Sequence, residues 1–233
     1  MKEKYRFKEK DFTRDRVLRF SIVMVLIIRK GLKSIQVTLN EFFSGLSLPS
    51  VSGVAFCKAR KKLSHCAFIE LNEKAIVNVT YQGNNFRTFK GYRLLAIDGS
   101  KIVLPDTPAI KEEFGTIPFT DGSTKEVGGE MPFGMASIMY DVLNHISIDS
   151  KLEKARAYEV DIAVKHLEKA NSKDLIIFDR GYASYRMLVE LIQRKINFVI
   201  RCSKGSFGVA QGMYQGWKRE PDCESFGSSE TKK

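Results

Sequence analysis

The sequence predicts a mixed α/β fold preceded by a small, all-helical region. Up to about residue 85 the chain has the apolar spacing of short helices, with no strand-like runs. From about Phe86 onward, short apolar runs alternate with amphipathic segments, the pattern of a sheet with flanking helices. Hydrophobic residues make up 43% of the 233 residues and charged residues 28%, which is a globular composition. We therefore expect a helical region over residues 1–85, an α/β domain over 86–208 and an irregular tail over 209–233.

Four short helices account for the N-terminal region. Thr13 is a candidate cap for the first and Gly31 a candidate stop, while Ser64 is a candidate cap for the last. The expected helices cover residues 13–30, 34–43, 52–63 and 65–78.

The α/β region begins with strand-like runs and continues with alternating helices and strands. Residues 105–134 are rich in Gly, Pro, Thr and Asp and are expected to form a long loop. The two strands that each follow a helix are expected to be parallel neighbours in one sheet. The expected strands cover residues 92–98, 102–104, 135–142, 146–152, 174–179 and 197–202, the third and fourth forming a hairpin. The expected helices cover residues 159–170 and 184–195.

Positive charge is concentrated at the N-terminal end. The whole chain has a formal net charge of +11, and residues 1–62 alone hold 15 Lys and Arg against 5 Asp and Glu, a local net of +10. Such a region attracts a polyanion, because each Lys or Arg that meets a phosphate releases condensed counterions. A solvated basic face that maintains solubility is the alternative interpretation.

Several other classes of protein are excluded or disfavoured. No apolar run reaches the roughly 18–20 residues that a membrane helix needs, and no signal-peptide pattern follows the charged N-terminus. The four cysteines form no CxxC pair, so a disulfide scaffold is not expected and a reducing cytoplasm is the default. Cys57, His65 and Cys66 do not have the spacing of a standard zinc finger. The three histidines have no Ser or Cys elbow beside them, and no phosphate-binding glycine loop precedes a helix.

Two carboxylates follow buried-type runs and are the candidate catalytic residues. Asp98 ends the run LLAID and Asp179 ends the run LIIFD. If the two strands are adjacent, both side chains reach the carboxyl edge of the sheet, where open α/β folds bind their ligands. Two acidic side chains placed close together repel one another, and a divalent cation such as Mg²⁺ relieves that repulsion. The structural alternatives are a turn at Asp98-Gly99 and stabilisation of the following helix N-terminus by Asp179.

The third expected helix is the candidate nucleic-acid element. Lys58, Lys61 and Lys62 share one face by their i, i+3, i+4 spacing, and Arg60 lies between them in the sequence. We expect these four side chains to contact DNA phosphates.

Taken together, these motifs resemble the DDE transposases of the fourth insertion-sequence family. The residues that carry the resemblance are LLAIDGSKIVLPDT, FGT at Phe114–Thr116, SIMYDVLN at Ser137–Asn144, LIIFDRGYASYRMLVEL, and the N-terminal LPSVSGVAFCKARKKLSHCAFIELNE. The resemblance extends over most of residues 13–208.

The resemblance implies a ribonuclease-H-like catalytic domain that performs DNA transposition. It places the first two metal-binding carboxylates on Asp98 and Asp179, and Arg180 and Tyr182 of the same motif near the DNA backbone. The implied cofactor is Mg²⁺, with Mn²⁺ as a substitute. The implied partner is double-stranded DNA, both transposon ends and target, bound by a homodimer in a synaptic complex. The implied location is the cytoplasm, in association with the nucleoid and without a membrane.

The third carboxylate of the family, a Glu on a C-terminal helix, has no counterpart that the sequence pattern identifies. Glu220, Glu224 and Glu230 occur in the tail, where periodicity is lost after Gly208. We therefore expect a catalytic domain whose C-terminal part is missing through a frameshift or early stop. The alternative function is a non-catalytic DNA-binding fragment that occupies transposon ends or inhibits a full-length transposase.

Overall fold

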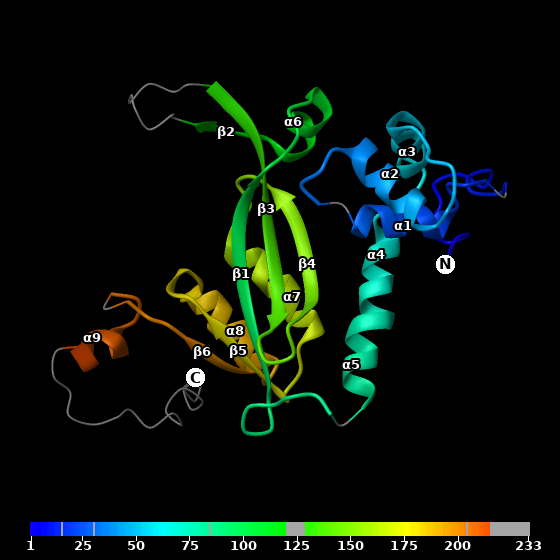
Figure 1. Cartoon of the computed structure of the whole chain (residues 1–233). Helices are drawn as coiled ribbons and strands as arrows, with labels where there is room; N and C mark the ends of the chain where they lie inside the picture. The colour runs from blue at the N-terminus through cyan, green and yellow to red at the C-terminus, as the bar shows by residue number, and fades with distance from the viewer. Residues whose placement is uncertain (15, 30, 84, 120–128, 204, 215–233) are drawn as a thin grey trace. The chain divides into compact units, whose positions relative to one another are not determined.

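The computed structural model describes residues 1–233 except 15, 30, 84, 120–128, 204 and 215–233, and Figure 1 traces its elements. The chain divides into two units, Met1–Gly83 and Asn84–Lys233. No helix in the described part is both long and apolar enough to cross a bilayer.

The first unit is entirely helical. Ser34 and Ser52 cap two of its helices by accepting hydrogen bonds from the backbone N–H groups of Val37 and Ala55. The helices are α1 (Phe20–Ile28), α2 (Ile35–Gly45), α3 (Gly53–Arg60), α4 (Cys66–Leu71), the π-helix η1 (Asn72–Val77) and α5 (Asn78–Gln82).

An aromatic and aliphatic core holds this unit together. Burial of large apolar side chains from successive helices is the main stabilising contribution, at about 25 cal/mol per Å² of apolar surface. The most buried members are Val23, Leu26, Leu39, Phe43, Phe56 and Ala67.

The first helix is shorter than the sequence predicted. It begins at Phe20, because the Thr13 hydroxyl donates a hydrogen bond to the Lys10 carbonyl oxygen instead of capping a helix. Phe12 has a φ of 58° and packs edge-on against the Phe20 ring at 5.5 Å, so the chain enters the helix from a sharp bend. The fourth predicted helix is longer than expected and continues through η1 to Gln82.

The second unit is built on a mixed sheet. The described strands are β1 (Arg93–Val103), β2 (Thr116–Phe119), β3 (Gly129–Asp141), β4 (Ile146–Lys154), β5 (Asp174–Phe178) and β6 (Asn197–Ile200). Their order is β2-β3-β1-β5-β6, with β4 also paired to β3. The β1, β3 and β4 pairings are antiparallel, whereas β1 with β5 and β5 with β6 are parallel. This topology confirms the predicted mixed sheet, including the parallel neighbours β5 and β6, and is consistent with a ribonuclease-H-like fold.

Helices flank the sheet. They are α6 (Pro108–Phe114), α7 (Glu159–His166) with its 3₁₀ continuation η2 (Leu167–Lys169), the 3₁₀ turn η3 (Arg180–Tyr182), α8 (Tyr185–Gln193) and α9 (Gly208–Tyr214). Helix α7 contacts β1, β3 and β4. The core side chains of this unit include Leu95, Ile97, Met139, Ile176, Phe178, Met187 and Leu191.

The face of the sheet that does not contribute to this core carries exposed apolar side chains on neighbouring strands. Ile138, Ile177 and Val199 are 39–55% exposed, although each lies next in sequence to a more buried residue. This alternation is the period of two expected of a sheet with one covered face.

Three sequence predictions for this unit were wrong in detail. The two runs at 92–98 and 102–104 form one strand, because β1 stays paired with β3 from Leu95 to Val103. The expected loop at 105–134 contains α6, β2 and the first half of β3. The expected irregular tail begins with the helix α9, whereas Glu220, Glu224 and Glu230 lie outside the described residues.

Candidate active site and nucleic-acid interface

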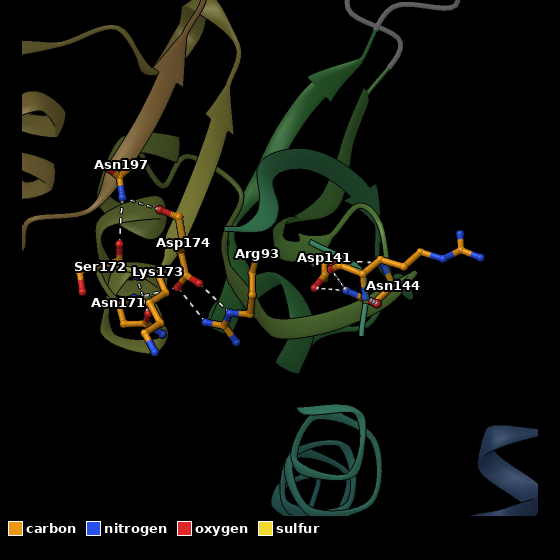
Figure 2. A network of polar contacts seen from close by, with 9 residues as sticks. Arg93, Asp141, Asn144, Asn171, Ser172, Lys173, Asp174 and Asn197 are labelled. Atoms are coloured by element: carbon orange, nitrogen blue, oxygen red, sulfur yellow. Dashed lines mark hydrogen bonds and ion pairs between the residues drawn. The ribbon is translucent and has the colours of Figure 1, made fainter. Parts of the chain in front are cut away.

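A buried ion pair fixes the register of the two strands that carry the candidate carboxylates. Arg93 opens β1 and Asp174 opens β5, and the two residues are Cα partners in the parallel ladder. Arg93 donates from Nε to Asp174 Oδ1 at 2.6 Å and from Nη2 to Oδ2 at 2.7 Å, as Figure 2 shows. The Asp174 side chain is fully buried, so this bidentate pair strongly disfavours any other register.

Further hydrogen bonds tie the neighbouring segments to the same end of β5 (Figure 2). The backbone N–H of Asn171 donates to Asp174 Oδ2 at 2.8 Å. Asn197, the first residue of β6, donates from Nδ2 to the carbonyl oxygens of Ser172 and Asp174 at 2.9 and 3.2 Å. The starts of β1, β5 and β6 are therefore fixed relative to one another.

The turn between β3 and β4 is closed by a second polar network (Figure 2). Asp141 is fully buried and accepts from the backbone N–H groups of Leu143 and Asn144 and from Asn144 Nδ2. Asn144 also exchanges two hydrogen bonds with the Arg87 backbone, at 2.8 and 3.0 Å. This network holds the chain that leads into β1 against the hairpin.

Asp98 and Asp179 occupy matching positions on adjacent strands. Each lies five residues beyond its member of the Arg93–Asp174 pair, and the parallel ladder runs from that pair to Ala96 and Ile177. Both carboxylates are exposed, the Asp179 side chain by 61%. The sheet therefore presents two acidic side chains together where β5 ends.

The immediate surroundings of Asp179 are basic and open. Arg201, just past β6, lies 3.8 Å from Asp179 Oδ1 through its Nη1 and is itself 75% exposed. Arg180 follows Asp179 in the turn η3 and is exposed. As the side chains lie, no three His, Cys, Asp or Glu residues in the described part of the chain form a ready metal-ligand group.

Tyr182 differs from its prediction. Its side chain is only 2% exposed and packs at 5.6 Å against the Phe178 ring, so it cannot touch a DNA backbone in this structure. Its backbone N–H donates to the Asp179 carbonyl oxygen at 3.1 Å, which shapes the turn after β5. The role that this structure gives Tyr182 is therefore internal packing beneath the carboxylates.

The Tyr182 hydroxyl lies beside Gly99 and a third carboxylate, that of Glu159. Burial, followed by the negative charges of Glu159, Asp98 and Asp179, raises the pKa of this hydroxyl above its ordinary value of 10.0. The hydroxyl therefore stays protonated at neutral pH and can donate a hydrogen bond. The sequence did not single out Glu159, because an acidic residue at the first position of a helix is common for reasons of the helix dipole alone.

The four predicted basic residues lie at the C-terminal half of α3 and just beyond it. Lys58, Arg60, Lys61 and Lys62 are all exposed. Lys62 lies 3.6 Å from Asp11 and is partly neutralised, and Arg60 lies 6.0 Å from the centre of the Phe56 ring. Lys58 and Lys61 form no ion pair with any described residue, so they are the cations most available to a phosphate.

A groove in the first unit joins α3 to the N-terminal segment. Its volume is about 870 Å³. Besides Lys58 and Lys62, its basic lining residues are Lys10, Arg14 and Arg16. The local charge of the sequence indicated a basic region. Only the folded structure shows that the N-terminal segment and α3 line the same groove.

The comparisons with known proteins agree with this geometry. Residues 89–226, more than half of the chain, match the family described as the transposase DDE domain. The chain belongs to this family. The match includes β1, β5 and both candidate carboxylates, and it continues beyond Gly208, where the resemblance found in the sequence fades. No curated protein matches the sequence significantly.

Two solved transposase structures are similar over most of the chain. One is the Drosophila P element transposase strand transfer complex, with 9% identity, a TM-score of 0.38, and coverage of 84% of this chain and 43% of that one. The other is the piggyBac transposase synaptic complex with hairpin DNA, with 14% identity, a TM-score of 0.36, and coverage of 85% and 43%. The chain spans less than half of the length of either.

The DDE domain family uses divalent metal ions, and the residues at this edge of the sheet fit such an ion. Asp98 and Asp179 supply carboxylate oxygens, the ligands that hard divalent cations prefer. The buried Tyr182 hydroxyl has no hydrogen-bond partner in the described part of the chain. A rearranged side chain or a ligand would therefore find a free hydrogen-bonding group there. Both observations are compatible with a cation at this position.

A buried histidine network elsewhere in the domain resembles a catalytic triad in its connectivity. His166 Nδ1 lies 2.8 Å from Asp149 Oδ2, and its Nε2 lies 3.1 Å from Ser137 Oγ. Ser137 is 2% exposed and His166 is fully buried, so neither can reach a substrate in this structure. The network ties α7 to β3 and β4.

Proposed function

We propose that this DDE-family chain is a transposase of the fourth insertion-sequence family that binds transposon ends and catalyses metal-dependent DNA cleavage and strand transfer. The observation that supports this most directly is the register of β1 and β5. The parallel ladder runs from the buried Arg93–Asp174 pair to Ala96 and Ile177, and Asp98 and Asp179 lie at equivalent positions beyond it, which supports a shared cation site. An exposed pair of carboxylates on a ribonuclease-H-like sheet suits phosphoryl transfer better than any other chemistry in the described residues.

Asp98 and Asp179 would hold Mg²⁺, for which Mn²⁺ is a substitute. When bound, the cation supplies charge stabilisation and activation of the attacking oxygen in phosphoryl transfer. Arg180 is exposed next to Asp179 and would contact the DNA backbone near the scissile phosphate. In this proposal the protein acts as a homodimer on two transposon ends and a target duplex, in the cytoplasm and in association with the nucleoid.

A strand-cleavage assay on the element's own ends tests the catalytic part. With Mg²⁺ or Mn²⁺ the chain should nick the ends, and Asp98→Asn or Asp179→Asn should reduce the rate by at least about 100-fold. Asp106→Asn is the matched control, because Asp106 is exposed and pairs only with Lys111 among the described residues. Cleavage that survives both active-site substitutions would exclude these carboxylates from the chemistry.

A gel-shift titration over a range of salt concentrations tests the nucleic-acid part. Lys58→Ala and Lys61→Ala should each weaken binding to end DNA and reduce the magnitude of the log–log salt slope by about 0.9 for each phosphate that the variant no longer neutralises. Lys62→Ala should have a smaller effect, because Lys62 is paired with Asp11. Lys33→Ala is the control, since Lys33 lies outside α3 and pairs with Glu41.

A second candidate function is DNA-end binding without catalysis, including inhibition of a full-length transposase. The observation in its favour is that the basic charge lies in residues 1–62, within the helical unit Met1–Gly83, which has a basic groove beside α3. Tight end binding with no cleavage under either metal would support this second function against the first.

A further inference from the structure

The N-terminal segment presents two arginines beside α3 because the residues on either side of them are anchored in the helical core. Phe12 and Leu18 pack against that core, and Arg14 and Arg16 are exposed between them. Neither arginine forms an ion pair with a described residue. The described part of residues 10–18 therefore forms one wall of the groove beside α3, with its cations available to a ligand.

Contacts farther upstream hold this wall in place. The backbone N–H of Phe7 donates to the Lys62 carbonyl oxygen at 3.1 Å, and that of Ser64 donates to the Tyr5 carbonyl oxygen at 2.9 Å. Tyr5 is buried, and its hydroxyl donates to the Glu70 carboxylate. These contacts join the first residues of the chain to the segment that follows α3. The groove is therefore built by the fold and does not depend on a free terminus.

The lining of the groove combines cations with small or apolar side chains. Ala55 and Ala59 lie one turn apart on α3, so their short side chains let a ligand approach the helix closely. A sugar-phosphate backbone matches such a lining, because its phosphates are anionic and its deoxyribose rings are largely apolar. The described lining contains no Asn or Gln, the side chains that pair with adenine edges. Its basic residues are Lys10, Arg14, Arg16, Lys58 and Lys62, and its apolar residues include Val17, Leu18 and Val51.

The acidic residue in the described lining is held away from a ligand. The Asp11 side chain is only 8% exposed, and its Oδ1 lies 3.6 Å from Lys62 Nζ. Its Oδ2 accepts a hydrogen bond from the Lys8 backbone N–H at 3.2 Å. Asp11 therefore screens Lys62 and leaves the other lining cations unpaired with it.

We propose that residues 10–18 form the second half of the DNA interface, and that the groove between them and α3 binds a sugar-phosphate backbone without reading its sequence. This inference rests on the proposed function and extends it from the cations of α3 to Lys10, Arg14 and Arg16. Contacts to phosphates position a protein on a duplex, whereas contacts to base edges provide the specificity. Groove variants should therefore lose affinity for every DNA sequence by the same factor.

Fluorescence anisotropy of the full chain with two labelled duplexes, one carrying the element's end and one of unrelated sequence, tests the inference. Arg14→Ala and Arg16→Ala should each weaken binding several-fold, by the same factor for both duplexes, and reduce the magnitude of the log–log salt slope by about 0.9. Lys33→Ala is the control, because it removes the same charge from the same unit at a residue that pairs with Glu41 outside the groove.

The slopes separate a failure of the inference from a failure of the proposed function. Unchanged slopes in Arg14→Ala and Arg16→Ala, with reduced slopes in Lys58→Ala and Lys61→Ala, would overturn the inference and leave the proposed function standing. Unchanged slopes in all four variants would defeat the DNA interface of the proposed function, and the inference with it.

Arg14→Lys distinguishes a backbone contact from base readout. A lysine replaces the charge of an arginine at a phosphate, but not the planar fork with which arginine recognises a base edge. This variant should therefore keep most of the wild-type slope and the wild-type ratio of affinities for the two duplexes. A loss of affinity confined to the end duplex would mean that the groove reads bases, and would overturn the inference.

Asp11→Asn protects the test against misfolded variants, because it should strengthen binding. The amide oxygen can still accept from the Lys8 N–H, while the loss of the charge frees Lys62 for a phosphate. Affinity for both duplexes should rise several-fold, and the salt slope should become steeper by up to about 0.9. Unchanged or weaker affinity in a variant with the wild-type unfolding temperature would count against a phosphate-binding groove.

Discussion

The two ends of the β1–β5 pair carry the same kind of residue in opposite environments. At the starting end, Asp174 is fully buried and receives two hydrogen bonds from Arg93 and one from the Asn171 backbone. Farther along the two strands, Asp98 and Asp179 are exposed, and Asp179 pairs loosely with the exposed Arg201 at 3.8 Å. A buried charge with fixed partners specifies geometry, whereas an exposed carboxylate remains available to a ligand. The fixed end thus determines the register at which the open end presents its carboxylates.

Breaking the buried pair should give the largest effect on stability. In Arg93→Ala the Asp174 carboxylate stays buried without its bidentate partner, so we expect a loss of about 3–5 kcal/mol in the free energy of unfolding, measured by urea denaturation. The double variant Arg93→Met with Asp174→Asn removes both charges and keeps an oxygen for the Asn171 N–H. It should recover most of that loss. A single variant that loses less than about 1 kcal/mol would show that the pair does not fix the strands.

Removing Asn144 should have the next largest effect. Asn144 connects Asp141 with both the N–H and the carbonyl oxygen of Arg87. Asn144→Ala should therefore lower the free energy of unfolding by about 1–2 kcal/mol, because the buried Asp141 carboxylate and the Arg87 backbone each lose a hydrogen-bond partner. His145→Ala is the control, since His145 is an exposed neighbour in the same turn. His145→Gly is a second control, because His145 has a φ of 56°, a conformation that Gly adopts readily. Equal losses at positions 144 and 145 would contradict a specific role for the Asn144 network.

The histidine network should contribute a smaller, pH-dependent effect. Burial alone would raise the pKa of Asp149, but hydrogen bonds from His166 and Lys151 outweigh it and hold that pKa below the ordinary value of 3.8. A carboxyl group with a lowered pKa stabilises the fold above its ordinary pKa, and this contribution is lost as the pH falls through the lowered value. The stability difference between wild type and Asp149→Asn should thus be constant from about pH 6 to 5 and shrink below about pH 4. A difference that grows on acidification would contradict the assignment.

Sequence reasoning found the parts of β1 and β5 that lead to Asp98 and Asp179, because LLAID and LIIFD are continuous apolar runs that stop at a carboxylate. It read β1 as two pieces, because Gly99 and Ser100 resemble a turn until the pairing of Ser100 with Ala136 on β3 is known. The partnership of Arg93 with Asp174 joins residues 81 positions apart and depends on strand order, which local patterns do not contain. The contact of Glu159 with the Gly99 position was missed for the same reason, because it arises only where α7 packs on β1.

The smallest stability effect is expected at the open end of the two strands. Asp98→Asn and Asp179→Asn should each change the free energy of unfolding by less than about 0.5 kcal/mol, because exposed side chains with weak pairing contribute little to stability. Urea denaturation without metal measures this, and the same variants should lose cleavage activity. Repeating the unfolding with Mn²⁺ sharpens the contrast, since a cation that binds only the folded state stabilises the wild type in proportion to its occupancy. That added stability should vanish in both variants and persist in Asp106→Asn. A large loss of metal-free stability in either active-site variant would instead mean that the open end, like the buried end, serves the fold.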